Sequence, residues 1–567
     1  MSWPRYHGED YVDFAYVEEF CRALAEEHPE WVDLREEGRS HHGRPLLVLT
    51  LGSQTLRPGE PPRGKRPALW LDAGTHASEF TGISAVLFTI TRWMEGLLAG
   101  DDALTEWFTR HDVVIMPCIS PDGVQYVFEG GPRLRSSLSP PLPGQVRSGL
   151  DTCDVNGDGK IRMMRWKDPA GSFVGDEEWA PFLRPRRIDD DPEEAYFLAA
   201  EGEFINWDGV KWVRAPRAYG VDLNRNFPGQ WEPFAMFGMH AGRYSLSEPE
   251  SRAVVDAFAT HPHIGCALTM HTYTGCILTQ PYRKDTPLSK LDIELMESVA
   301  TDLARDTGYD VFRVYPDFSY DPDRPIVGVW ADTIATVFGV PGYTVECWNP
   351  FPYADLEIEK PLEFLMRPDP ERLCKLLKAF ARDEEDHAEW EPFDHPQLGP
   401  VEIGGIEYMR TLRNPPVHLL AEECEKLFLM CDRARHSLPR VTARVEVEPV
   451  GAAHRLRIIL ENQGFLSTSG LKHGEKVGAA PGVSVALELD DELLCAHPTS
   501  VSLPHLEGWG ELRVDHSRHN VYAGLSTGGH RQFAEWTLQG AGEVTLRWQA
   551  GRAGTGQITV EIPHSDG

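Results

Sequence analysis

The sequence predicts an α/β protein: a mixed, mostly parallel sheet of the eight-stranded type with helices on both faces, followed by an all-β sandwich. In the first part of the 567 residues, short apolar segments alternate with segments whose apolar residues recur at helical spacing. Apolar strands separated by helices are typical of a sheet covered on both faces. After Pro439, apolar and polar residues alternate with a period of two between turns, which favours short strands packed as a sandwich.

The strands and helices of the first sheet can be assigned from these two patterns. We expect strands at Pro45–Gly52, Ala68–Ala73, Asp112–Ile119, Ala267–His271 and Tyr343–Cys347. We expect helices at Val17–Ala25, Glu79–Leu98, Glu250–Thr260, Leu288–Thr307 and Pro370–Asp383. Long connections between successive strands are what parallel pairing requires.

Changes in residue composition and in hydrophobic periodicity along the chain predict the domain boundaries. The first domain is expected to span residues 1–395, with a long insertion at about 130–220 that is rich in Gly, Pro, Asp and Arg and is weakly periodic. Residues 396–439 are expected to be a linker with a helix at Leu419–Ala434. Residues 440–567 are expected to form the β-sandwich domain.

The composition restricts the class of protein. The chain has 55 Lys and Arg residues and 87 Asp and Glu residues, which gives a net charge of −32. Because this charge repels phosphate groups, we expect neither nucleic acid nor membrane as a partner. No apolar run reaches the roughly 20 residues that span a bilayer. The N-terminal segment has no basic and apolar signal pattern, and the ten cysteines are scattered without a CxxC pair, so we expect a cytoplasmic protein.

Polar residues that can bind a metal follow three of the predicted strands. His76 and Glu79 come directly after the strand at Ala68–Ala73, where open α/β sheets bind their ligands. Such a pair is common by chance, and Glu79 could merely stabilise a helix N-terminus. His271 ends a second strand, and three protein ligands with one open position are typical of catalytic zinc. Glu346 closes a third strand among apolar residues, where a glutamate needs a role or a partner.

A fourth polar segment, GVDLNRNF, lies between the insertion and the second half of the first domain. Arg225 offers a planar fork that suits a carboxylate, and Asn224 supplies an amide donor beside it. Asp222 could orient a ligand histidine by a hydrogen bond. The alternative for all three residues is a polar turn.

The four segments HASE, GVDLNRNF, MHTY and TVEC occur in an order that resembles the zinc carboxypeptidase family of the carboxypeptidase A type. The resemblance extends over roughly residues 8–385. It implies that His76, Glu79 and His271 are the zinc ligands and that Glu346 is the general base.

The same resemblance assigns the substrate-binding residues. It implies that Asn224 and Arg225 hold the terminal carboxylate of the substrate, that Asp222 lies behind the first histidine, and that Tyr273 lines the substrate cleft. The tyrosine that closes over the substrate in the family has two candidates here, Tyr315 and Tyr320, and the sequence does not choose between them.

The insertion resembles bacterial relatives that carry a D-x-N-x-D-G segment followed by MR and DP. By that resemblance Arg165 stabilises the oxyanion, with Arg162 as the alternative. The 1-3-5 spacing of three residues also imitates the start of a calcium loop, with an Asx-rich turn as the alternative; these residues are Asp154, Asn156 and Asp158. Further arginines of the insertion would make a basic cleft or a solvated surface; they are Arg184, Arg186, Arg187, Arg214 and Arg217.

These observations predict a zinc metallocarboxypeptidase, a hydrolase that removes the C-terminal residue of a peptide. Zn²⁺ is the expected cofactor, with Ca²⁺ as a second candidate, and the expected ligand is a peptide or amino-acid conjugate with a free carboxylate. Two alternatives remain open: an amidase or deacylase that acts on small amino-acid or glutamyl conjugates with the same zinc site, and a non-catalytic binding protein.

Overall fold

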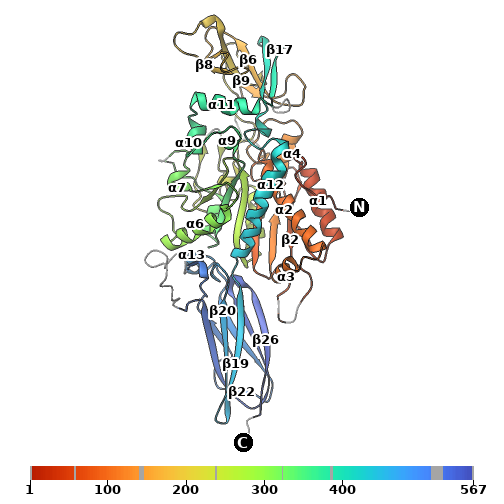
Figure 1. The fold of residues 1–567 in the computed structure, drawn as a ribbon, viewed down its shortest axis with the longest axis vertical. Coiled ribbons are helices and arrows are strands. Elements are labelled where there is room, and N and C mark those ends of the chain that lie inside the picture. Colours follow the sequence, from red (N-terminus) through yellow and green to blue (C-terminus); the bar gives the residue numbers. More distant parts are fainter. Residues whose placement is uncertain are drawn as a thin grey trace.

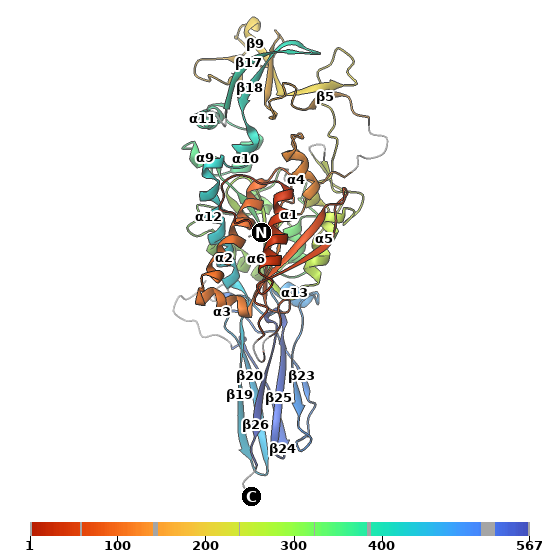
Figure 2. The ribbon, with the colours of Figure 1, turned by 90° about the vertical axis from the view of Figure 1, so that its right-hand side faces the viewer.

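Three units lie in a row along the long axis of the molecule (Figure 1): a small six-stranded sheet, a central α/β unit and a β-sandwich. Figure 2 shows the same order after a turn of 90°, with the C-terminus at the far end of the sandwich. The structure, a computed structural model, describes residues 3–56, 59, 61–139, 146–236, 239–321, 324–382, 387–511 and 528–564.

The central unit is built on an eight-stranded mixed sheet. In spatial order its strands are β1 (Val32–Arg39), β2 (Pro45–Leu51), β4 (Asp112–Met116), β3 (Ala68–Ala73), β13 (Ile264–Thr272), β16 (Gly342–Cys347), β14 (Cys276–Thr279) and β15 (Asp310–Arg313). The β4–β3, β3–β13, β13–β16 and β14–β15 pairs are parallel, and the other three pairs are antiparallel. The predicted mixed, mostly parallel sheet is therefore confirmed.

Two apolar layers cover the faces of this sheet because its strands are buried on both sides. Leu69 and Leu71 of β3 pack in one layer, whereas Ala68 and Trp70 pack in the other. The first layer includes helices α1 (Phe14–Glu27), α2 (Phe80–Leu98), α6 (Lys290–Ala304) and α12 (Val417–Ala434). The second includes α5 (Pro249–Ala259) and α8 (Trp330–Thr336). Helices on both faces, as predicted, follow from the near-continuous apolar runs in the strands.

The insertion folds into a second sheet together with a segment from much later in the chain. In spatial order the strands are β17 (His387–His395), β18 (Gly399–Ile406), β6 (Met163–Lys167), β9 (Ala195–Ala200), β7 (Phe173–Gly175) and β8 (Leu183–Pro185). The boundary expected at residue 395 thus falls between two paired strands, and residues 396–406 extend the insertion's sheet instead of forming an irregular linker.

Shorter elements complete the first two units. The helices are α3 (Asp102–Arg110), α4 (Pro121–Phe128), α7 (Val314–Asp317), α9 (Pro350–Tyr353), α10 (Pro361–Met366) and α11 (Pro370–Phe380). The strands are β5 (Gly149–Thr152), β10 (Gly202–Ile205), β11 (Ala235–Met236) and β12 (Met239–His240). In the described part of the chain no helix is both long enough and apolar enough to cross a membrane.

The C-terminal unit is a β-sandwich, as the period-two pattern predicted. One antiparallel sheet has the order β19 (Val441–Val450), β20 (Ala453–Asn462), β24 (Arg531–Gln539), β22 (Leu494–Cys495). The other has the order β23 (Ser500–Leu503), β21 (Val483–Leu489), β25 (Gly542–Ala550), β26 (Thr555–Ile562). A short helix, α13 (Lys472–Lys476), lies in the connection from β20 to β21. Alternate residues of the strands face one another in a shared apolar core.

A buried arginine joins the sandwich to the central unit. Arg552, which is 2% exposed, donates from its guanidinium to the carbonyls of Pro262 and Ile264 at 3.0 Å each, and to the carbonyl of Phe338. It also donates to Ser469 of its own unit at 3.0 Å. A single side chain therefore satisfies backbone carbonyls on both sides of the junction.

Replacement of this arginine tests the junction. We expect Arg552→Met to lower the free energy of unfolding by about 3 kcal/mol, because the buried carbonyls lose their donor. The measurement is urea denaturation followed by circular dichroism. Arg547→Met is the matched control, since Arg547 and its partner Glu488 are 57% and 55% exposed. Equal losses in the two variants would contradict the assignment of Arg552 to the junction.

Candidate active site

Three neighbouring parallel strands of the central sheet have polar residues at or just beyond their carboxyl ends. His76 and Glu79 follow β3 and precede α2, and His271 is the penultimate residue of β13. In the register of β13 and β16, His271 lies opposite Glu346. Because β3, β13 and β16 run parallel and side by side, their carboxyl ends meet at one place.

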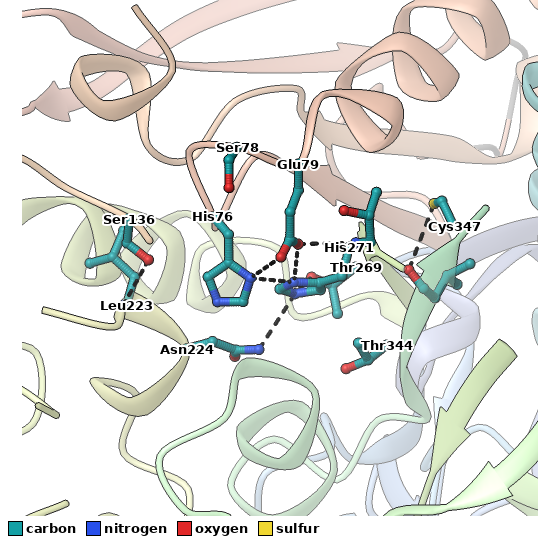
Figure 3. Close-up of polar contacts among 12 residues, drawn as sticks. His76, Ser78, Glu79, Ser136, Leu223, Asn224, Thr269, His271, Thr344 and Cys347 are labelled. Carbon is teal, nitrogen blue, oxygen red and sulfur yellow. Dashed lines mark hydrogen bonds and ion pairs between the residues drawn. The ribbon is translucent and has the colours of Figure 1, made fainter. Parts of the chain in front are cut away.

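The side chains of His76, Glu79 and His271 converge at this edge (Figure 3). His76 Nδ1 is 2.9 Å from Glu79 Oε1 and 3.0 Å from His271 Nδ1. His271 Nδ1 is 3.0 Å from Glu79 Oε2. All three side chains are buried, with exposures of 2%, 1% and 1% in the order of the sequence.

The outer nitrogens of both rings have their own partners, which turns the Nδ1 atoms toward the cluster. His76 Nε2 lies 3.2 Å from Asp222 Oδ1, and a carboxylate there fixes the proton on Nε2. His271 Nε2 lies 3.4 Å from Thr269 Oγ1 and 3.5 Å from the side-chain nitrogen of Asn224.

This arrangement fits a zinc ion. Two nitrogen lone pairs and a carboxylate turned to one point repel one another unless a cation lies between them. Tetrahedral zinc with bonds of about 2.0–2.1 Å separates its ligand atoms by about 3.3 Å. The observed distances of 2.9–3.0 Å are close to that separation, and the donor set of two imidazoles and one carboxylate is one that zinc prefers.

Two arginines and a backbone amide surround the carboxylate of Glu79. Arg135 Nη1 is 3.4 Å from Glu79 Oε1, and Arg413 forms an ion pair with the same oxygen. The amide of Thr272 donates to Oε2 at 3.0 Å. Burial would raise the pKa of Glu79, but the charges of His76 and Arg413 hold it well below its usual value, so Glu79 is ionised.

Arg135 was missed by the sequence analysis although it contacts two residues of the site. Its Nε donates to Asp222 Oδ2 at 3.0 Å, and the neighbouring Ser136 Oγ accepts from the amide of Leu223 at 3.2 Å. Burial would lower the pKa of Arg135, but Asp222 and Glu79 raise it above its usual value. The only signal was the polar pair Arg135-Ser136 near the start of the insertion, and 87 residues separate Arg135 from Asp222.

Asn224 and Arg225 lie in a buried 3₁₀ turn beside His271. Trp330 donates its backbone amide to Asn224 Oδ1 at 2.9 Å, which leaves the Asn224 NH₂ group toward His271. Arg225 Nη1 donates to the carbonyl of Asn224 at 2.6 Å, and the guanidinium stacks on Phe234, 5.2 Å from the ring centre. Arg225 is 5% exposed and its Nε has no hydrogen-bond partner within the described structure, so a donor is available for an anionic ligand.

Glu346 lies on β16 and Tyr273 directly follows β13, each beside the cluster. Burial raises the pKa of Glu346 to about 7; His271 opposes this increase and Glu79 adds to it. Tyr273, two residues beyond His271, is partly buried and has the guanidinium of Arg413 5.6 Å from its ring centre. Two tyrosines are candidates for the residue that closes over the substrate. Tyr320 lies near enough to Arg135 to raise its pKa, whereas Tyr315 donates its backbone amide to the carbonyl of Pro281.

The expectation that Arg165 or Arg162 stabilises an oxyanion is corrected by the structure. Arg165 lies in β6 of the six-stranded sheet, where its Nε donates to Glu402 at 2.8 Å and its guanidinium stacks on Trp390 and Tyr196. Arg162 donates to Asp158 at 3.2 Å. Both side chains have structural partners in the insertion's sheet, and the arginines that contact the cluster are Arg135 and Arg413.

The calcium candidate receives no support either. The side chains of Asp154, Asn156 and Asp158 accept hydrogen bonds from backbone amides of their own turn, those of Gly157, Gly159, Asp158 and Lys160. Within the described ranges, the residues that could hold a metal together do not include these three. Their spacing therefore reflects an Asx-rich turn.

Comparisons with known proteins identify a family for the first part of the chain. The pattern that defines the family described as "Zinc carboxypeptidase" matches residues 17–349, and a domain of unknown function matches residues 441–561. Carboxypeptidase B of Helicoverpa zea is 20% identical over 349 residues, which cover 60% of this chain and 62% of that protein. Carboxypeptidase B of Astacus astacus is 27% identical over 128 residues, 23% of this chain and 37% of that protein.

Two further comparisons define the limits of the similarity. A protein named inactive metallocarboxypeptidase from Uncinocarpus reesii is 27% identical over 121 residues, which cover 21% of this chain and 20% of that protein. The crystal structure of thrombin activatable fibrinolysis inhibitor covers 76% of this chain and 75% of its own, with 17% identity and a TM-score of 0.40. The chain thus spans less than two thirds of the length of the curated relatives that it matches here.

The mixed sheet and the buried cluster at the carboxyl ends of its strands define the class of protein: an α/β protein with three side chains that can hold a metal ion together. The family match, which covers more than half of the chain, makes the assignment specific. The chain belongs to the zinc carboxypeptidase family.

The contact between Asp222 and His76 generates a testable prediction. We expect Asp222→Asn to weaken zinc binding about 10–100-fold, because the amide no longer fixes the proton on His76 Nε2. The measurement is competition for zinc with a chromophoric chelator. Glu402→Gln is the matched control, since Glu402 also accepts from an arginine Nε but lies in the six-stranded sheet. An unchanged zinc affinity in Asp222→Asn would show that this contact does not support the metal.

Proposed function

We propose that the protein is a zinc metallocarboxypeptidase that hydrolyses the C-terminal amide bond of peptides. The single observation that carries the proposal is the placement of the buried Asn224–Arg225 pair beside the ligand cluster, with Asn224 reaching His271. A zinc site alone serves many hydrolases, whereas a desolvated arginine with an unpartnered N–H next to it selects substrates that carry a carboxylate at the cleaved end.

Substrate binding is assigned to two side chains with complementary roles. Arg225 would bind one or both oxygens of the terminal carboxylate, and the NH₂ group of Asn224 would donate to the same group. The contacts of Arg225 with Phe234 and with the carbonyl of Asn224 restrict its orientation before substrate arrives. Such preorganisation lowers the entropy cost of placing the scissile bond at the metal.

We assign the reaction to the metal and two side chains. A bound zinc ion would supply Lewis-acid polarisation of water and of the scissile carbonyl. Glu346, opposite His271 in the strand register, would accept a proton from the attacking water and transfer it to the departing amine. Arg135 bonds to Asp222 and Glu79 through two of its N–H groups and retains others that would stabilise the oxyanion.

Paired substrates test the selection of a free carboxylate. We expect a blocked dipeptide with a free terminal carboxylate to be cleaved at least tenfold faster, in kcat/KM, than the same dipeptide with an amidated end, since a hydrogen bond to a charged group contributes about 1.5–3 kcal/mol. Arg225→Gln should remove most of that preference. Equal cleavage of both substrates would favour an amidase instead, and cleavage of neither, in protein without bound zinc, would favour a non-catalytic binding protein.

The pH dependence tests the role of Glu346. A general base works when it is deprotonated, so kcat/KM should fall tenfold per unit of pH below its pKa. The pKa of about 7 applies without metal, and a bound cation stabilises the carboxylate, so the acid limb should lie at or below pH 7.

The corresponding variant is Glu346→Gln, for which we expect kcat to fall by about 10²–10⁴-fold. Zinc content measured by elemental analysis is the control, because Glu346 is not among the three ligands. Full activity in a zinc-loaded variant would show that another group accepts the proton.

A further inference from the structure

A segment outside the region matched by the family lies against the ligand cluster. Residues 407–414, the wall segment, follow β18 and precede α12. Asn414 anchors the segment: its side chain donates to the carbonyl of Ser78 at 3.0 Å and accepts from the amide and hydroxyl of Thr81 at 3.1 and 3.0 Å. Trp348, which follows β16, donates from its indole to the carbonyl of Thr411 at 2.8 Å. The wall segment is therefore bonded to the chain on both sides of the site.

Arg413 of the wall segment brings a buried positive charge to the cluster. It pairs with Glu79, stacks on Tyr273 and is 6% exposed. Its Nε is buried and has no hydrogen-bond partner among the described residues. Glu79, its carboxylate partner, also contacts Arg135 and is a ligand in the proposed metal site. One carboxylate shared in this way leaves the positive charge of Arg413 only partly compensated.

A second arginine, Arg133, places another positive charge on the solvent side of Arg413. The guanidinium of Arg133, an exposed residue, lies over the ring of Tyr408, 5.1 Å from its centre, and Tyr408 lies beside Tyr273. Arg133 makes no ion pair with a carboxylate in the described parts of the chain. The positive charges of Arg413, Arg135 and Arg217 lie near enough to act on Arg133. Arginines that repel one another in a protein of net charge −32 indicate a site for an anion.

The position of this charge relative to Arg225 tells which part of a peptide would meet it. The side-chain nitrogen of Asn224 lies beside the outer nitrogen, Nε2, of His271, whereas Arg413 pairs with the carboxylate of Glu79. Figure 3 shows Asn224 and Glu79 on opposite sides of the histidine rings. If the terminal carboxylate lies at Arg225, the acyl side of the scissile bond extends toward Arg413 and Arg133.

We propose that Arg133, which lies over the ring of Tyr408, and Arg413, which lies over the ring of Tyr273, form a subsite for a carboxylate on the acyl side of the scissile bond. The substrates are then peptides with an acidic residue before the C-terminal residue. The planar fork of arginine suits a carboxylate, and the partly buried setting strengthens the pair. This inference rests on the proposed carboxypeptidase function and adds the substrate class.

The test compares two peptides that differ in one charge, with Glu or Gln before the same C-terminal residue and a blocked N-terminus. We expect the protein to prefer the Glu peptide by about tenfold in kcat/KM, and Arg133→Gln to reduce this ratio to about one, since a charge-assisted contact is lost. Arg133→Lys, which keeps the charge but not the fork, should retain part of the preference. Arg187→Gln is the matched control, because Arg187 is an exposed arginine of the insertion's sheet region.

A binding measurement separates this inference from the proposed function. In the Glu346→Gln background, where we expect cleavage to be slow, calorimetry gives the Kd of each peptide, and the Glu peptide should bind about tenfold more tightly. Equal Kd values, or an equal loss of preference in Arg187→Gln, would overturn the subsite. If neither peptide is cleaved by the unmodified protein, the carboxypeptidase proposal fails, while the two Kd values still decide whether the subsite exists.

Discussion

Two imidazole nitrogens and a carboxylate that turn to one buried point favour a cation between them, and the rest of the central unit is arranged around this constraint. The parallel strands β3 and β13 deliver His76, Glu79 and His271 to one edge, and β16 adds Glu346 in register. Asp222 fixes the outer nitrogen of His76. The sheet therefore supplies both the position of the ligands and the rigidity that holds them close together.

The charges around this cluster form a connected set. Glu79 pairs with Arg135 and Arg413, and Arg135 also pairs with Asp222, so each of these four buried charges has at least one partner of opposite sign. Buried charges are tolerated only when they are paired in this way. Arg225 and Arg413 each keep one buried N–H without a partner in the described structure.

Much of the central unit could be predicted because its signals are local. The strand at Ala68–Ala73 was predicted with the bounds that the structure shows, and the helix expected at Glu79–Leu98 differs from α2 by one residue. Both depend on apolar residues at fixed spacing. The ligand residues could be found because each follows or ends such a strand, where a polar side chain among apolar ones has few structural uses.

The fold of the insertion and the positions of Arg135 and Arg413 could not be predicted, because they depend on contacts between residues far apart in the sequence. Strands β7 and β8 have three residues each, too few for a periodic pattern, and β6 pairs with β18, more than 200 residues further along the chain. Arg413 lies 334 residues from Glu79 in a segment without periodicity. Arg165 was chosen instead because a resemblance fixes order along the chain but not distance in space, and its partners in the folded protein are Glu402 and two aromatic rings.

The wall segment shows that the residues around the cluster extend beyond the region matched by the family. All three ligands and Glu346 lie within residues 17–349, yet Arg413 and Asn414 enter only after the chain has left that region and completed the six-stranded sheet. A shortened chain that ended at residue 349 would retain His76, Glu79 and His271 and would lose the contacts that Arg413 and Asn414 make beside them. Engineering of this scaffold must therefore keep the core and the excursion together, because the later part of the chain finishes a site that the earlier part begins.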